Sequence, residues 1–131
     1  MTMNNKLSEQ EPYQEKREKP WGYEIIYTKP GLPYAGKILS VLAGSKLSLQ
    51  YHDKKQETIM LLEGRALLWL GDSPDAITKI SMDTARGYDI EVGKIHRLEA
   101  ISDCLFLEAS TPEGGTTYRI EDDYQRDNET R

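Results

Sequence analysis

Leu47–Gly64, with the sequence LSLQYHDKKQETIMLLEG, is the stretch that decides the fold of this chain. Its first part alternates between apolar and polar residues, and side chains two apart in a strand project from the same face. Gln50 and His52 therefore share one face of a predicted strand. The short polar loop DKKQ then leads into a second strand, which begins at Glu57 and ends at a glycine.

Four residues with metal-binding side chains are associated with this stretch. Gln50, His52 and Glu57 lie within it, and His96 is the second of the two histidines in the chain. Imidazole nitrogens together with carboxylate or amide oxygens suit a divalent cation that keeps an open coordination position. We expect the four to form one metal site, provided that a closed or sandwich-like sheet brings His96 close. The alternative is that His52 is a surface loop residue and His96 an ordinary strand residue.

The rest of the chain shows the pattern of an all-β protein. Short alternating or apolar runs recur between turn-forming residues, and no segment has the period of an amphipathic helix. Such a pattern is typical of a β-sandwich or barrel. We expect 57–64 and 65–71 to pair as a hairpin across Glu63-Gly64. The nine predicted strands are 21–28, 35–44, 46–51, 57–64, 65–71, 77–82, 87–92, 96–101 and 104–111.

Length and composition limit the domain organisation. A chain of 131 residues fits one domain with a real core. Residues 1–18 are polar and aperiodic, so we expect a flexible N-terminal arm, a single domain over 19–126 and a disordered C-terminus over 127–131. The only cysteine, Cys104, lies in an apolar run and is expected to be a core thiol.

Charge and hydropathy narrow the class of partner. The formal net charge is −5, which argues against nucleic acid or an anionic membrane surface and favours a small molecule. No apolar run approaches the roughly 18 residues that a membrane span needs, and no signal-peptide core precedes the domain. We therefore expect a cytoplasmic protein without nucleic-acid or membrane partners.

The opening stretch resembles the first motif of the cupin superfamily, whose members are small double-stranded β-helix (jelly-roll) barrels. Gly44, His52, Glu57 and Gly64 match that motif, and Lys54 stands at the position of its second histidine. The resemblance implies a cupin-type jelly-roll barrel with a metal at its mouth.

Within the cupins, the sequence is similar to the C-terminal domain of type II mannose-6-phosphate isomerases. Four segments carry this likeness, namely Lys19–Glu24, Leu47–Glu57, Gly93–Glu99 and Arg119–Arg126. The second cupin motif falls at 91–96, with Glu91 in place of its proline. The Gln-x-His pair also looks like the zinc-site pair of type I isomerases.

The isomerase resemblance implies a metal-dependent enzyme that interconverts an aldose and a ketose phosphate through an enediolate. Its ligands would be Gln50, His52, Glu57 and His96, with zinc expected and manganese, cobalt, nickel or iron as alternatives. Two further competing functions are a non-catalytic metal- or sugar-binding cupin with a regulatory role, and an iron-dependent dioxygenase-type cupin.

Two residues are candidates for catalytic groups beside the metal. Lys54 can act as a proton shuttle or stabilise charge, and its alternative is a solvated loop lysine. Arg119 can contact a phosphate or the enediolate if the tail folds over the barrel mouth, whereas its alternative is an ion pair on a solvated tail. Arg97 is expected to point away from His96, because adjacent strand residues face opposite sides.

The resemblance also implies a homodimer that binds a small sugar phosphate or a related sugar. The apolar strand near Trp21 is the expected place at which the sheet of one copy extends the sheet of the other.

Overall fold

The computed structural model describes residues 11–112 and 114–130, and this part of the chain forms β-strands without an α-helix. The all-β prediction is therefore confirmed. The strands are β1 (Glu15–Lys19), β2 (Gly22–Ile26), β3 (Ala35–Val41), β4 (Leu49–His52), β5 (Glu57–Glu63), β6 (Ala66–Gly71), β7 (Ile77–Ser81), β8 (Gly87–Ile90), β9 (Ile95–Ala100), β10 (Cys104–Ser110), β11 (Thr116–Glu121) and β12 (Glu129–Thr130).

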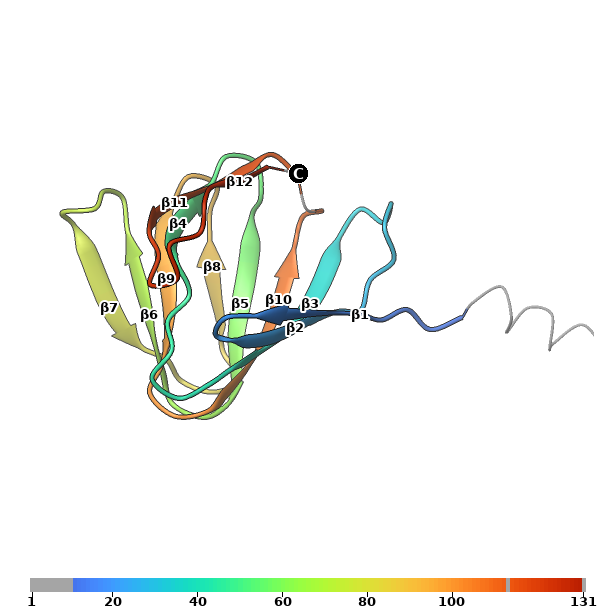
Figure 1. The fold of residues 1–131 in the computed structure, drawn as a ribbon, viewed down its shortest axis with the longest axis horizontal. Coiled ribbons are helices and arrows are strands. Elements are labelled where there is room, and N and C mark those ends of the chain that lie inside the picture. Colours follow the sequence, from blue (N-terminus) through green and yellow to red (C-terminus); the bar gives the residue numbers. More distant parts are fainter. Residues whose placement is uncertain (1–10, 113, 131) are drawn as a thin grey trace, which may run out of the picture.

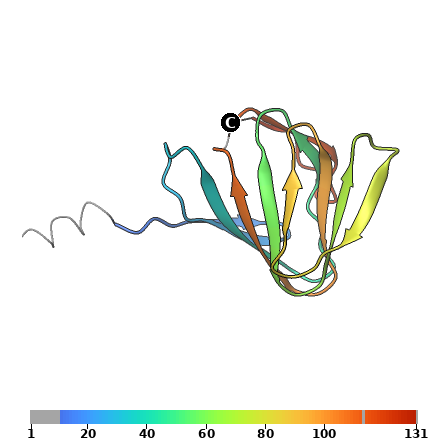
Figure 2. The same ribbon diagram turned by 180° about the vertical axis from the view of Figure 1, so that it is seen from behind.

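Two six-stranded sheets face each other and form a barrel (Figures 1 and 2). The first sheet has the order β1-β2-β3-β10-β5-β8, and the second has the order β12-β11-β4-β9-β6-β7. From β3 to β6 and again from β8 to β11, each successive strand crosses to the opposite sheet. This crossing is what a jelly roll requires, and it confirms the predicted fold class.

The predicted hairpin between 57–64 and 65–71 is wrong. β5 pairs with β10 and β8 in the first sheet, whereas β6 pairs with β9 and β7 in the second. Gly64, with φ of 99°, lies in the bend between them, where an added Cβ would come within 2.3 Å of the Asp103 carbonyl oxygen. The turn therefore bends the chain from one sheet to the other, because burying both apolar strands needs two layers.

The first strand begins inside the segment that was predicted to be a flexible arm. Residues 1–10 of the expected arm lie outside the described residues, but Glu15–Lys19 form β1 and pair with β2. β2 is thus paired on both edges, and Trp21 is buried in the core. The expected extension of a partner's sheet by the strand near Trp21 is therefore wrong, because β1 occupies the edge. The homodimer itself stays a prediction.

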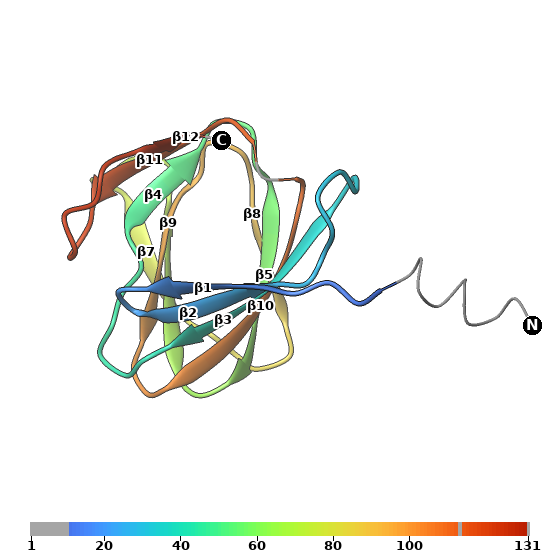
Figure 3. The ribbon, with the colours of Figure 1, turned by 45° about the vertical axis from the view of Figure 1, so that its right-hand side comes forward.

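The C-terminal segment folds back beside β4 at one end of the barrel (Figure 3). β11 pairs with β4 through its first residues and with β12 on its other edge. Glu129–Thr130 form β12, so ordered structure extends past the expected domain end at Arg126, and residue 131 lies outside the described residues.

Side chains that point inward form rows that are apolar at one end of the barrel and polar at the other. Leu39, Ile59, Leu98 and Phe106 belong to the buried core between the sheets, together with the buried thiol Cys104. Two positions along each strand from these four apolar residues lie Lys37, Glu57, His96 and Glu108, and all four are buried. Strand alternation thus carries the inward face from the core to a polar mouth. No helix in the described residues is long and apolar enough to cross a membrane.

Candidate metal centre

The candidate ligands come together because three strands end or begin at the polar mouth. His52 ends β4, Glu57 begins β5 and His96 is the second residue of β9. β4 and β9 are neighbours, and Gln50 lies opposite His96 in their register. The chain then crosses to the first sheet within four residues, so Glu57 faces the two histidines from the opposite layer.

His52, Glu57 and His96 are all buried, with exposed fractions of 6%, 4% and 3%. His96 Nε2 lies 3.1 Å from Glu57 Oε1, and His52 Nε2 lies 3.9 Å from Glu57 Oε2. One ligand atom from each residue can be chosen so that all three atoms lie within 4.8 Å of one another. Ligand atoms at about 2.0–2.2 Å from one ion have such separations. The predicted grouping of these three residues is present in the structure.

The hydrogen bonds of both rings leave their Nε2 atoms directed at this point. His96 Nδ1 donates to the Lys94 carbonyl oxygen at 2.9 Å, and His52 Nδ1 lies 2.9 Å from Thr117 Oγ1. A carbonyl oxygen only accepts, so His96 Nδ1 carries a proton, and Nε2 is the ring atom that faces Glu57. A ring nitrogen and a carboxylate oxygen that lie 3.1 Å apart can share a proton or bind one metal ion. The donor set therefore fits a divalent metal.

Gln50 is half-buried and lines the same cavity as His52 and Glu57. Its Oε1 atom accepts a hydrogen bond of 2.6 Å from the buried Ser48 hydroxyl. The carboxamide is therefore held beside the triad, and its role as the fourth ligand stays a prediction.

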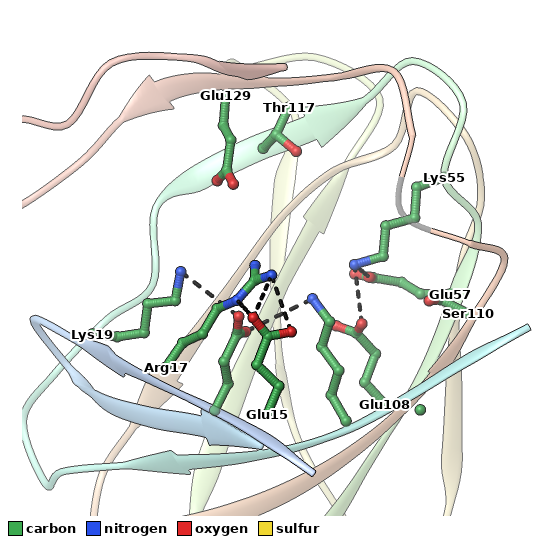
Figure 4. Close-up of polar contacts among 12 residues, drawn as sticks. Glu15, Arg17, Lys19, Lys55, Glu57, Glu108, Ser110, Thr117 and Glu129 are labelled. Carbon is green, nitrogen blue, oxygen red and sulfur yellow. Dashed lines mark hydrogen bonds and ion pairs between the residues drawn. The ribbon is translucent and has the colours of Figure 1, made fainter. Parts of the chain in front are cut away.

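Lys55, and not Lys54, is the lysine at the centre. Lys54 is exposed and is absent from the cavity lining, whereas Lys55 is only 5% exposed. Its ammonium lies 3.1 Å from Glu57 Oε2 and 3.0 Å from Glu108 Oε2 (Figure 4). The predicted placement of Lys54 beside the metal is therefore wrong, and the next residue, Lys55, occupies that place. An extended chain puts Lys55 and Glu57, two residues apart, on one side, and this parity was the available signal.

The two carboxylates that flank Lys55 have different pKa values, because their electrostatic surroundings differ. Burial raises the pKa of Glu57, but the Lys55 ammonium and the two histidines outweigh it and hold this pKa well below its usual range. Burial and the Glu57 charge raise the pKa of Glu108 to about 7, despite the opposing effects of Lys55 and Lys37. Glu57 is therefore the anionic ligand, and Glu108 can exchange a proton near neutral pH.

Arg119 lies in the wall of the cavity, and its catalytic role stays a prediction. β11 carries it, and its guanidinium contacts the Asp127 carbonyl oxygen and pairs with Glu129 at 3.2 Å. Its Nε atom is buried without a hydrogen-bond partner among the described residues. The tail thus covers this side of the mouth, and Arg119 keeps one donor that a ligand can use.

Arg97 points away from His96, as expected. Its side chain is fully buried under the C-terminal segment, where Nε donates to the Leu47 carbonyl oxygen at 2.7 Å. Nη2 also lies 3.3 Å from the carboxylate of Asp123. Arg97 therefore fastens the C-terminal segment over β4 and β9.

Together, these residues can bind a metal ion, provide a carboxyl group that titrates near neutrality, and place cations around a cavity of about 80 Å³. Such a set can polarise a ligand oxygen and move a proton next to it.

Comparison with known proteins shows the fold. No protein-family model matches the sequence, and no curated protein matches it significantly. The capsular polysaccharide assembling protein CapF from Staphylococcus aureus matches 90% of this chain and 34% of its own, with a TM-score of 0.67 and 14% identity. Bacillus subtilis oxalate decarboxylase OxdC matches 82% and 30%, with a TM-score of 0.70 and 18% identity.

KdgF from Halomonas sp. matches 76% of this chain and 88% of its own, with a TM-score of 0.63 and 13% identity. The chain spans about a third of the length of the CapF and oxalate decarboxylase structures. All three neighbours are cupin-fold proteins, and the chain therefore has the cupin jelly-roll fold.

Proposed function

We propose that this protein is a metal-dependent sugar-phosphate isomerase of the mannose-6-phosphate isomerase type. The observation that carries the proposal is the buried triad of His52, Glu57 and His96, whose nitrogen and oxygen atoms converge. His52 and Glu57 also line a cavity. The sequence resemblance to the isomerases supports the choice of reaction. Among the structural neighbours, CapF is a capsular polysaccharide assembling protein.

Aldose–ketose isomerisation moves a proton between two adjacent carbons of an open-chain sugar. A bound divalent metal would supply Lewis acidity for the two sugar oxygens and stabilise the negative charge of the enediolate. Glu108 takes the proton from one carbon and returns it to the other, because its pKa of about 7 suits both directions. Lys55 holds Glu57 and Glu108 in place and donates toward developing negative charge.

Arg119 contributes the second positive group. Its buried Nε donor lies in the cavity wall and can bind a phosphate or enediolate oxygen, for which the guanidinium fork is well suited. Gln50 serves as a fourth ligand if Ser48 releases its amide oxygen.

Conversion of mannose 6-phosphate to fructose 6-phosphate by the full chain, with zinc, manganese or cobalt added in turn, tests the proposal. We expect turnover with at least one metal and its loss in Glu57→Ala and His96→Ala. Lys54→Ala is the matched control and should keep its activity, because its side chain is exposed. Stoichiometric metal binding without turnover would instead support the non-catalytic alternative, and oxygen consumption with iron would support the dioxygenase alternative.

A further inference from the structure

Glu24 is a buried carboxylate in the cavity that the proposed reaction does not use. It lies on β2, is 5% exposed and lines the same cavity as His52 and Glu57. Its Oε1 atom is buried without a hydrogen-bond partner among the described residues. Leaving a buried acceptor unsatisfied is unfavourable, so a carboxylate oxygen kept at a cavity wall indicates a ligand donor.

Two lysines flank Glu24 without satisfying that oxygen. Lys19 Nζ lies 3.7 Å from Oε1, and Lys37 Nζ lies 3.7 Å from Oε2. Charge-assisted hydrogen bonds are about 2.7–2.9 Å long, so both distances are those of ion pairs and leave room for closer donors. Lys19 and Glu24 come from the β1–β2 hairpin, and Figure 4 shows the Lys19 ammonium directed inward.

The wall around Glu24 carries charges of both signs. Glu24 lies between the ammonium groups of Lys19 and Lys37. The other charged residues that line the cavity are Lys55, Glu57, Glu108, Arg119, Arg126 and Glu129. A hydroxyl group can donate to a carboxylate and accept from an ammonium, and it therefore matches such mixed pairs.

We propose that Glu24, with Lys19 and Lys37, forms a subsite for the neutral hydroxyl groups of a polyol chain, in the cavity that His52 and Glu57 line. The assignment rests on the proposed function only in naming the ligand as an open-chain sugar. Glu24 accepts from the hydroxyls, and the two ammonium groups donate to them. The subsite also assigns a role in substrate recognition to the Lys19–Glu24 motif, which the proposed reaction does not explain.

Sorbitol is the probe, because it is an uncharged, unreactive open-chain hexitol. Its affinity for the full chain is measured by ligand-observed NMR titration, both without metal and with zinc. We expect Glu24→Gln to weaken sorbitol binding about tenfold or more, as loss of a charged acceptor does, and to leave zinc affinity unchanged. The control is Glu18→Gln on the same hairpin, whose side chain is 77% exposed and which should bind sorbitol normally.

A second variant covers the possibility that Glu24→Gln does not fold, because that change leaves buried Lys37 without its carboxylate. Glu24→Gln combined with Lys37→Met keeps the charges balanced and should show the same loss. Sorbitol binding at wild-type strength in a folded variant, or no sorbitol binding by the wild type, overturns the subsite. Glu24-dependent sorbitol binding without isomerase activity supports the subsite and overturns only the proposed function.

Discussion

Adjacent lysines in the loop between β4 and β5 have opposite surroundings. Lys54 is exposed, whereas Lys55 is buried between the carboxylates of Glu57 and Glu108. An ammonium in this place offsets two buried negative charges, and removing one partner of a buried charge network is costly. Two lysines that are adjacent in the sequence should therefore contribute very differently to the stability of the fold.

Replacing Lys55 by methionine should destabilise the metal-free protein by about 3 kcal/mol, because two buried carboxylates lose their counter-charge. Lys54→Met should change the free energy of unfolding by less than about 0.5 kcal/mol, as surface substitutions do. Urea unfolding of the metal-free variants measures both values. Equal effects of the two substitutions would contradict the assigned role of Lys55.

Glu108 should make the stability of the metal-free protein depend on pH. Its folded-state pKa of about 7 lies above the ordinary glutamate value of 4.5, so the folded state holds the proton more tightly. The contribution is fully present below pH 4.5 and is lost as the pH rises through 7, by roughly 3 kcal/mol. The lowered pKa of Glu57 acts in another window, below pH 4.5, and with the opposite sign.

Unfolding free energies of the wild type and Glu108→Gln at pH 5 and pH 8, with a chelator present, measure this contribution. The wild type should lose stability relative to the variant between the two values. A difference between the two proteins that does not change with pH would show that Glu108 keeps one protonation state.

At the scale of elements, β11 joins the C-terminal segment to the metal centre. Thr117 pairs with His52 in the register of β11 and β4, and its hydroxyl lies 2.9 Å from His52 Nδ1. Asp53 then accepts a hydrogen bond from the Thr116 amide at 2.7 Å. Strand pairing and two side-chain hydrogen bonds thus orient the ring of one ligand.

Thr117→Val should lower zinc affinity by about 10–100-fold, as loss of a hydrogen bond to a metal-ligating histidine does. Thr117→Ser retains the hydroxyl and is the matched control, with affinity near that of the wild type. Titration against a competing chelator measures both. Equal zinc affinity in the valine and serine variants would show that the hydroxyl does not position His52.

For the whole molecule, the metal centre joins the two sheets at one end of the barrel. Glu57 belongs to the first sheet, and His52 and His96 belong to the second. A ligand that binds only the folded state stabilises it by mass action.

Zinc at about 100 times its dissociation constant should add about 2.7 kcal/mol to the stability and raise Tm by roughly 5 °C or more. His96→Ala should lose most of this shift, because its site has one ligand fewer. Thermal unfolding followed by circular dichroism, with zinc and with a chelator, measures the effect. An equal zinc-dependent shift in His96→Ala would place the metal elsewhere.

The sequence by itself determined the strand class and the direction of individual side chains, because alternation with period two is a local property of the chain. It placed Gln50 and His52 on one face, and these two residues line one cavity in the structure. The pairing of two distant histidine stretches was expected from the residue types and strengthened by the resemblance.

The tertiary structure alone decided which strands pair and which charged groups meet. β5 and β6 go to different sheets because burial requires two layers, and no local signal reports that choice. The loop between β4 and β5 places Lys55, and not Lys54, at the centre, because its path depends on where β5 enters the opposite sheet. Glu24 and Glu108 joined the cavity for the same reason, since their neighbours there lie on other strands and contacts across a barrel are non-local.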